Sequence, residues 1–408
     1  MVLLMPYSAV PEPAEIVGRA EGLVPVLASR AREAERQRRV PAETIAQLRE
    51  AGLFRLLQPR SGGGWGQGIR TFSDVARTVA RGCASTAWVY GFLVVHANML
   101  QGMSAEGRAE VFGPDGFAFV TTSSGFQATP SGRAVPANGG WRVTGRWPYA
   151  SASLNADWAF VMTVEAGELG SGPLGLVIPI TELAVLDVWH YSGMAATGSN
   201  DLVAEDVFVP ARRRWDPPKP QGSDPWPWNG TRPDPPWDAP MQGFSPLKTF
   251  GILQPAVAVG AAEAALELFR ERVATRVVAF GQGPQYGHRE AWARYARAAS
   301  TVRLARLLQD DQVRIVEQVT ENGAVLSADD AAMLRVGSAH VAELARDAVA
   351  VIMDGAGSSV HHLDHALQRI QRDIDTLKSH SYLNWDGAAT TAGSALLGHR
   401  PLDPLLMT

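Results

Sequence analysis

Apolar residues recur at helical spacing over the first hundred positions of the chain. Between residues 14 and 39, Ile16, Leu23 and Leu27 belong to an apolar stripe set among Glu and Arg, the pattern of a helix with one buried and one solvated face. Pro41 suits the first turn of a second helix, which Gly52 ends. Glycines crowd the segment 61–66 and predict a loop there, after which helices resume over 72–81 and 86–100.

The pattern changes from Phe117 onward. Short runs rich in Val, Phe, Thr and Trp are broken by glycine at intervals of about 8 to 12 residues, which is typical of a small all-β unit. The predicted strands are 117–122, 132–137, 141–145, 156–164, 175–178, 184–189 and 201–209.

A connector and a second helical region follow. Residues 216–246 hold ten of the chain's 27 prolines and show no periodic apolar face, so we expect a long connector of functional importance. Long amphipathic helices are then predicted over 247–280, 289–321, 328–354 and 363–385, with Gly355 and Gly357 ending the third.

The predicted organisation is α, then β, then α, an α+β fold. Its parts are an N-terminal helical domain over 1–116, a central β-barrel or sandwich over 117–215, the Pro- and Trp-rich connector over 216–246, and a C-terminal four-helix bundle over 247–408.

Composition and charge narrow the function classes. A chain of 408 residues with 46% hydrophobic and 19% charged residues is typical of a globular enzyme. The net charge of −4 (37 − 41) offers no positive field for phosphates, so we expect no nucleic-acid partner. The single cysteine, Cys83, cannot form an internal disulfide or a thiolate zinc site, and it favours a reducing, cytoplasmic location.

Membrane association is not expected either. The first residues lack a basic segment ahead of an apolar core, so they do not match a secretory signal. The apolar run 87–100 is shorter than the roughly 20 residues needed to span a bilayer, and it contains His96 and Asn98, so it predicts a buried helix.

Two motifs carry little functional weight. Gly170–Gly175 matches a dinucleotide-binding string, but no strand-to-helix turn surrounds it and Pro173 removes a needed backbone donor, so it predicts a turn between strands. His361, His362 and His365 lie beside Asp364 at partly helical spacing, yet no second cluster completes a metal shell. We therefore expect a structural or substrate-pocket role for them, and no metal.

Two other histidines are candidates for chemistry. His96 lies in the apolar run, where a core histidine bonded to the backbone is the favoured interpretation and a pocket group the alternative. His380 follows Arg372 by eight residues on what reads as one helix, so both side chains would point broadly the same way. Either this is a solvated face, or His380 is a general base, since an imidazole suits proton transfer at neutral pH.

The strongest local signal comes from two glycine-punctuated turns of the β unit. Gly145–Ser151 contributes Trp147, Tyr149 and Ser151, and Gly193–Asp201 contributes Thr, Ser and Asn side chains. An aromatic wall beside several hydroxyl and amide groups suits a flat ring with polar edges.

At these residues the chain resembles the acyl-CoA dehydrogenase fold superfamily. Within it, the chain is similar to two-component flavin-dependent monooxygenases such as the oxygenase component of p-hydroxyphenylacetate hydroxylase. The resemblance covers nearly the whole chain. It rests on four motifs in order, namely Ala84 to His96, Gly145 to Ser151, Met194 to Pro210, and Leu367 to His380.

The resemblance assigns expected roles to individual residues. It implies that Trp147 and Ser151 line the isoalloxazine, with the serine near flavin N5, and that Thr197, Ser199 and Asn200 help to hold the ring or its phosphate chain. Arg276, ahead of Phe280 and Gly281, is similar to an arginine that reaches a cofactor phosphate across a subunit boundary. The remaining positions that it places around the cofactor or the reacting face are Trp88, His96, Ser123 or Ser124, Arg372 and His380.

The resemblance also implies the reaction. The glutamate that acyl-CoA dehydrogenases commonly carry in a Tyr-Glu-Gly motif is replaced by His380-Ser381-Tyr382, so thioester dehydrogenation loses its usual base. The expected enzyme takes reduced flavin (FADH2 or FMNH2) from a separate reductase and uses O2, through a C4a-hydroperoxyflavin, to hydroxylate a small phenolic or indole-type substrate. His380 is the expected base, His96 orients the substrate, and Ser151 stabilises the flavin adduct.

Alternatives remain open at this point. They are oxidation at nitrogen or sulfur, a true acyl-CoA dehydrogenase, and a catalytically silent helical scaffold. The long C-terminal helices carry apolar residues on more than one face, which predicts a homotetramer built as a dimer of dimers.

Overall fold

The fold was analysed in a computed structural model of the chain. The structure describes residues 10–114, 116–123, 131–166, 174–215, 239–241, 246–279, 282–322 and 326–399. The turn predicted over 170–175, most of the 216–246 connector, Phe280, Gly281 and Ser124 lie wholly or mainly outside these ranges.

The N-terminal part is helical. Its helices are α1 (Pro13–Gln37), α2 (Ala42–Glu50), α3 (Ile69–Gly82), α4 (Ala84–Met99) and α5 (Ala105–Phe112). Ser104 caps α5 by accepting a hydrogen bond from the Gly107 amide at 3.1 Å. Helix α4 is buried on every face over Ala84–Ala97, which explains why its sequence is apolar without an amphipathic period.

The central part is one mixed sheet. Its strands are β1 (Val120–Thr122), β2 (Gly132–Ala137), β3 (Gly140–Ala150), β4 (Trp158–Glu165), β5 (Leu174–Pro179), β6 (Ala184–Leu186), β7 (Asn200–Pro210) and β8 (Arg214–Trp215). The strand order is β6-β7-β3-β2-β4-β5-β8, with β1 added parallel to β4. Antiparallel β7 and β3 are the second and third strands of this order, and the register between them shifts between Trp147 and Ala150.

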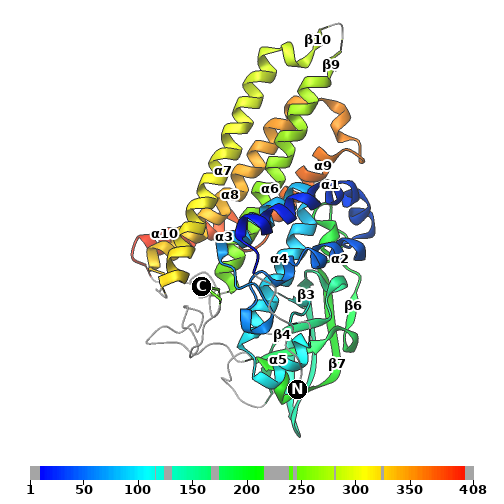
Figure 1. The fold of residues 1–408 in the computed structure, drawn as a ribbon, viewed down its shortest axis with the longest axis vertical. Helices are drawn as coiled ribbons and strands as arrows, with labels where there is room; N and C mark the ends of the chain where they lie inside the picture. Colours follow the sequence, from blue (N-terminus) through cyan, green and yellow to red (C-terminus); the bar gives the residue numbers. More distant parts are fainter. Residues whose placement is uncertain are drawn as a thin grey trace.

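The C-terminal part is a bundle of long helices that projects from the rest of the molecule (Figure 1). Helices α6 (Pro246–Thr275), α7 (Arg289–Asn322) and α8 (Ala328–Ala356) form its length, and a short hairpin of β9 (Val277–Val278) and β10 (Gly283–Pro284) lies at its far end. The single helix predicted over 363–385 is wrong. It is divided into α9 (Ala366–Leu377) and α10 (Trp385–Leu396), and Asn384 caps the second by accepting from the Gly387 amide at 2.9 Å.

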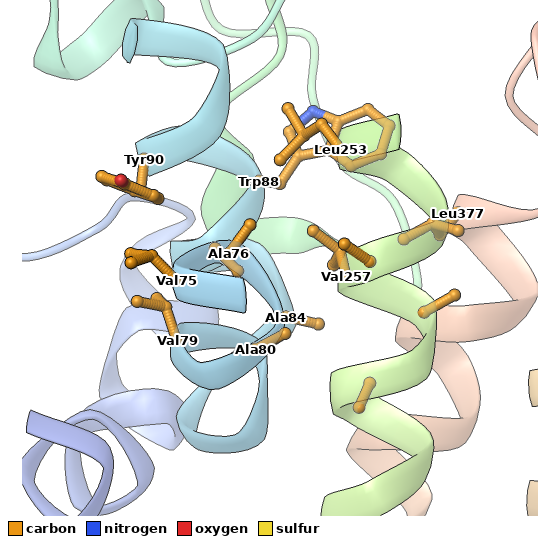
Figure 2. Packing of buried hydrophobic residues seen from close by; sticks show 14 of the residues in the cluster. Val75, Ala76, Val79, Ala80, Ala84, Trp88, Tyr90, Leu253, Val257 and Leu377 are labelled. Carbon is orange, nitrogen blue, oxygen red and sulfur yellow. The ribbon is translucent and has the colours of Figure 1, made fainter. Parts of the chain in front are cut away.

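Helices α4 and α6 pack closely and build the largest core. Gly91 permits this contact, because a Cβ at this position would overlap the buried side chain of Leu253. Figure 2 shows Trp88 beside Leu253 in this interface, whereas Tyr90 points to the other side of α4. On that other side, the Tyr90 hydroxyl donates to the Leu53 carbonyl at 3.3 Å.

Among the described helices, Lys248–Thr275 is long and apolar enough to span a membrane, but 72% of its most apolar window is buried inside the fold. That degree of burial is what a core helix shows. It accounts for the composition of α6 without a bilayer.

Candidate active site

Three hydroxyl groups form a continuous chain where the two predicted turns meet. The Ser151 and Ser199 hydroxyl oxygens are 2.8 Å apart, and those of Ser199 and Thr197 are also 2.8 Å apart. Thr197 in turn donates to the Met194 carbonyl at 2.8 Å. All three side chains are nearly buried, with exposed fractions of 2–6%. The turns 145–151 and 193–201 therefore present one polar edge.

Hydrogen bonds to backbone groups hold these turns in place. The Ala152 amide donates to the Thr197 carbonyl at 2.9 Å, and the Thr121 hydroxyl donates to the Ser151 carbonyl at 2.7 Å. Tyr149 and Ala152 have positive φ angles of 61° and 66°, which turn the chain sharply at the end of β3. Non-glycine residues in this region carry strain that is commonly found at ligand sites.

Trp88 joins the hydroxyl chain to the helices. Its indole nitrogen donates to the Ser151 hydroxyl at 3.1 Å. Its ring stacks on Phe92 with centroids 4.7 Å apart and meets the edge of His380 at 5.5 Å. The structure therefore brings the predicted Trp88, Ser151, Thr197, Ser199 and His380 into one cluster.

His380 lies in the turn after α9 rather than on the helix, so the argument that it points with Arg372 along one helix face is wrong. Its Nδ1 accepts a hydrogen bond from the Tyr382 amide at 3.2 Å, which makes Nε2 the N–H of the neutral ring. Burial and the neighbouring Arg335 guanidinium lower the pKa of His380 to about 4. The ring is therefore neutral at pH 7 and presents a donor in this tautomer.

His96 has one ring nitrogen bonded to the backbone, as a core histidine would, and one that is free for a ligand, as a pocket group would. Its Nδ1 lies 2.8 Å from the Val120 carbonyl, as expected for a core histidine that donates to the backbone. Its Nε2 is buried and has no hydrogen-bond partner among the described residues. Burial lowers the pKa of His96 to about 4, so Nε2 keeps a free lone pair at pH 7. Leaving such an acceptor unpaired costs about 1–3 kcal/mol, and a ligand hydroxyl would relieve that cost.

Aromatic rings line the space between His96 and Trp88. The Phe250 ring, from α6, lies 4.7 Å from Phe92 and 5.4 Å from His96 between centroids. A small cavity of about 10 Å³ borders this region and is lined in part by Lys248, Ser338 and Tyr382. A larger cavity of about 440 Å³, lined by Phe54 and Arg55 among others, lies on the Tyr90 side of α4 and is distinct from this cluster.

A second aromatic group flanks the turn 193–201. Trp189 stacks on Tyr191 at 3.8 Å and meets the edge of Tyr149 at 6.3 Å between centroids. The Trp189 indole donates to the Met194 carbonyl at 3.1 Å. The Asn200 side-chain oxygen accepts from the amides of Val188 and Trp189 at 3.1 and 3.0 Å, so Asn200 holds this aromatic segment in place.

Trp147 does not lie at this site, contrary to the expectation for it. Its side chain is fully buried in the sheet core, and its indole donates to the Met162 carbonyl at 2.8 Å. Tyr149, two residues further along β3, is 50% exposed and contacts Trp189 instead. Regular alternation would place both rings on one face of β3, but the register shift between Trp147 and Ala150 turns Tyr149 outward while Trp147 stays buried. Nearby, Ser123 donates to the Pro148 carbonyl at 2.6 Å.

The two predicted arginines lie apart from each other. Arg372 forms an ion pair with Glu35 at 2.5 Å and a hydrogen bond to the Ser192 carbonyl, next to the turn 193–201. Arg276 lies between α6 and β9, where it donates to Gln285 and to the Gly355 carbonyl, both at 3.3 Å. Within one chain it does not approach the hydroxyl chain.

The histidine cluster contributes to structure. The His365 Nδ1 accepts from the Leu367 amide at 3.1 Å and caps α9, and Asp364 pairs with Arg32 at 3.1 Å. Within the described ranges, no group of three or more His, Cys, Asp or Glu side chains is arranged to hold a metal ion.

The site's donor set fits a flat heteroaromatic ring with polar edges, because hydroxyls, an indole N–H and an aromatic wall converge on it. Comparison with known proteins specifies which ring. Residues 23–111 match the family profile "Acyl-CoA dehydrogenase, N-terminal domain" and residues 252–385 match "Acyl-CoA dehydrogenase, C-terminal domain". The chain is 32% identical over 413 residues to the FADH(2)-dependent resorcinol hydroxylase, oxygenase component, of Rhizobium sp. (strain MTP-10005), covering 97% of this chain and 98% of that protein.

The chain belongs to the flavin-dependent monooxygenases of the acyl-CoA dehydrogenase fold. It is also 31% identical over 395 residues to a pigment production hydroxylase of Rhodococcus sp. (strain ATCC 21145), covering 96% and 98% of the two chains. The solved structure of XiaF from Streptomyces sp. in complex with FADH2 and glycerol superposes with a TM-score of 0.86 at 27% identity, covering 96% and 97% of the two chains. The predicted fold class, family and enzyme type, an oxidoreductase that uses reduced flavin, are confirmed for this monooxygenase.

Sequence reasoning missed three residues of this monooxygenase's site. Tyr149 lies in the turn 145–151 beside Trp147, but the resemblance gives it no role, and Trp189 lies at the end of a predicted strand. Asp373 directly follows Arg372 in a charged segment, and its burial comes from the packing of α9 against the turn 193–201, which no local sequence pattern reveals.

Proposed function

We propose that this monooxygenase hydroxylates a small phenolic substrate with O2, using reduced flavin that a separate reductase supplies. The observation that supports this proposal is the position of Trp88, which bonds to the Ser151 hydroxyl on one side and contacts His380 on the other. A flavin edge can thereby lie on the Ser151 side of the Trp88 indole and a substrate ring on its His380 side. When bound, the reduced flavin supplies the activation of dioxygen.

The polar edge of the flavin is proposed to meet Ser151, Ser199 and Thr197. Tyr149 takes the role of aromatic wall that the resemblance gave to Trp147, because only Tyr149 is exposed. Asn200 acts by holding the Trp189 segment, and Ser123 by fixing the Pro148 carbonyl. Arg276 remains proposed as a contact to the cofactor of a neighbouring subunit.

The substrate ring is proposed to lie between Phe92, Phe250 and Trp88. The free lone pair of His96 Nε2 would accept a hydrogen bond from a substrate hydroxyl, which would satisfy a buried polar atom that has no partner among the described residues. An aromatic substrate suits these ring side chains, since ring pairs with centroids 4.5–7 Å apart gain about 0.5–1.5 kcal/mol beyond their buried area.

His380 is proposed to promote loss of the phenol proton. In the observed tautomer it does so as a donor, because Nε2–H would stabilise the phenolate. The base role expected from the sequence requires the other tautomer, in which the Tyr382 amide loses its acceptor. A phenolate is the more electron-rich ring, so either route favours transfer of oxygen to carbon.

Replacement of His380 tests this role. His380→Ala is expected to leave flavin affinity nearly intact while slowing product formation by about 10²–10⁴-fold, the usual contribution of a positioned proton-transfer group. Raising the pH toward 10 is expected to restore much of the rate, since phenols ionise near that pH unaided. The measurement is single-turnover product formation with resorcinol between pH 5 and 10.

Two comparisons sharpen the experiment. Protonation of His380 itself is expected not to lower the wild-type rate above about pH 5, because the pKa of His380 is about 4 and its ring stays neutral there. His380→Gln retains a side-chain donor, so it rescues the rate if His380 acts by donation and fails if His380 is the base. A wild-type rate in His380→Ala at every pH would remove His380 from the mechanism.

Assembly and location complete the proposal. We propose a homotetramer, a dimer of dimers through the C-terminal helices, acting in the cytoplasm without a membrane or nucleic-acid partner. The choice between FMN and FAD depends on the neighbouring subunit's Arg276 in this scheme.

A further inference from the structure

Helix α9 is attached to the hydroxyl chain through one buried carboxylate. Asp373 is 6% exposed, and its Oδ1 accepts a hydrogen bond from the Met194 amide at 2.6 Å. Met194 has a positive φ of 52° and begins the short helical turn that carries Thr197. Its own carbonyl accepts from the Thr197 hydroxyl and from the Trp189 indole. The backbone of Met194 therefore connects Asp373 with the hydroxyl of Thr197 and with the indole of Trp189.

The helix backbone touches the same turn. A Cβ at Gly193 would clash with the carbonyl oxygen of Arg372, so only glycine permits this approach. The Arg372 guanidinium bonds to the Ser192 carbonyl and pairs with Glu35 of α1. Residues 192–194 are thus held against α9 by three neighbouring contacts.

The contacts form a closed circuit. From Asp373 it runs through Met194, Thr197, Ser199 and Ser151 to Trp88, and from the Trp88 ring to His380. His380 lies in the turn three residues after the end of α9, so the circuit begins on α9 and ends in the segment that directly follows it.

We propose that Asp373 is a positioning residue that clasps the turn 192–199 to α9 and thereby fixes the distance between the flavin-binding hydroxyls and His380. This inference rests on the proposed function for its consequence, but the clasp itself is a property of the fold. Asp373 touches neither cofactor nor substrate in this scheme.

The clasp depends on pH. Burial raises the pKa of Asp373 to about 6, although the Met194 amide and the nearby Arg369 and Arg372 oppose the shift. The other ionisable groups that face it are Glu35 of α1 and Cys83 between α3 and α4. As the pH falls through 6 the carboxylate gains a proton and becomes a weaker acceptor, so the clasp loosens. His96 and His380 do not titrate in that window because the pKa of each is about 4.

Substitution of Asp373 tests the clasp with two readouts. The first is the dissociation constant of anaerobically reduced FMN, measured by calorimetry between pH 5 and 7.5. The second is hydrogen exchange of the peptide 187–199. Asp373→Ala is expected to weaken FMN binding by up to about tenfold to a hundredfold, because the free energy of the lost hydrogen bond between Asp373 and the Met194 amide limits what fixing the turn can contribute to affinity. It is also expected to speed exchange in 187–199 without speeding it throughout the sheet.

A conservative variant and a control separate positioning from general stability. Asp373→Asn keeps an acceptor oxygen, so it is expected to restore most of the affinity and to abolish the severalfold weakening that wild type shows from pH 7 to pH 5. Asp375→Ala, an exposed carboxylate on the same helix, is expected to match wild type in both readouts.

The outcomes are distinguishable. Wild-type exchange and FMN affinity in Asp373→Ala, or a wild-type pH dependence in Asp373→Asn, would overturn the clasp. If wild type itself bound no reduced flavin, the proposed function would fail, while the exchange of 187–199 would still decide whether Asp373 holds the turn.

Discussion

Ser151 shows how much of this site depends on one hydroxyl group. It accepts from the Trp88 indole, exchanges a hydrogen bond with Ser199, and its carbonyl accepts from Thr121. Its side chain has little freedom to turn away, because each neighbour is also fixed. The hydroxyl is therefore preorganised for a polar atom of the flavin.

Replacing Ser151 by Ala is expected to uncouple oxygen consumption from hydroxylation. Loss of a hydrogen bond to a polarised group is worth about 1.5–3 kcal/mol, or roughly a tenfold to hundredfold change in partition toward hydrogen peroxide. The ratio of product formed to oxygen consumed measures it. Ser153→Ala is the control. The Ser153 side chain is also nearly buried, but its hydroxyl donates to the Gly198 carbonyl and takes no part in the row of hydrogen bonds from Ser151 to Thr197. If Ser151→Ala formed as much product per oxygen consumed as Ser153→Ala and wild type do, Ser151 would have no part in the mechanism.

At the residue scale, the sequence indicates the chemistry of a side chain better than its direction. Ser151, Thr197 and Ser199 are candidates by their hydroxyl groups, and the structure brings the three together, while their contact with flavin stays a prediction. Trp147 and Tyr149 were both plausible ring walls. The register shift between Trp147 and Ala150 decides which of the two faces outward, and no residue type in β3 predicts that shift.

At the scale of elements, the approach of α4 to α6 sets how the aromatic cluster packs. Gly91 faces Leu253 at a point of close contact, and the Phe92 ring of α4 packs against the Phe250 ring of α6 with centroids 4.7 Å apart. Leu253 is fully buried, so it cannot yield without displacing its own neighbours.

Gly91→Ala is expected to destabilise the fold by about 1–3 kcal/mol, the usual cost of overpacking, although alanine is the better helix former. Gly18→Ala on α1 is the matched control, because a Cβ there meets no atom within 4 Å. This control is expected to stabilise the protein by up to about 1 kcal/mol. Urea unfolding of both variants provides the comparison, and a stabilised Gly91→Ala would show that the two helices are not in close contact.

Helices and strands were predicted most accurately where the sequence pattern that marks them is clear. Helices α7 and α8 and strands β2 and β7 match their predicted ranges to within a few residues, because the two helices carry a long apolar period and glycines precede or begin the strands. The division of 363–385 into α9 and α10 was missed. The capping signal at Asn384 and Gly387 was present in the sequence, but the apolar residues on both sides masked it.

At the scale of the whole molecule, the α-β-α order was predictable because composition changes at each boundary. The site was not predictable as a place, since Trp88, Ser151, Ser199 and His380 come from four segments that only tertiary packing brings together. The family resemblance supplied that proximity in advance. Without it, the two turns alone would have indicated a ring-binding surface and no more.

The whole molecule is expected to assemble. Leu304 and Leu307 on α7 are each 53% exposed and Met333 on α8 is 49% exposed, which leaves apolar surface on the bundle. Light scattering is expected to give a tetramer, and the double replacement Leu304→Asp with Leu307→Asp to give smaller species. Arg303→Gln, at an exposed polar neighbour, is expected to leave the tetramer intact. A stable monomer of the wild type at micromolar concentration would contradict this assembly.

Hydroxylation with chemically reduced FMN or FAD, without reductase or nicotinamide, is the decisive experiment for this monooxygenase. The protein is mixed with this flavin, resorcinol or 4-hydroxyphenylacetate, and ¹⁸O2, and the product is analysed by mass spectrometry while flavin oxidation is followed optically. We expect one ¹⁸O atom in each hydroxylated product and flavin oxidation at a rate that differs from that of free flavin. Oxidation at the free-solution rate, with all oxygen recovered as hydrogen peroxide, would show that the protein does not direct oxygen to a substrate.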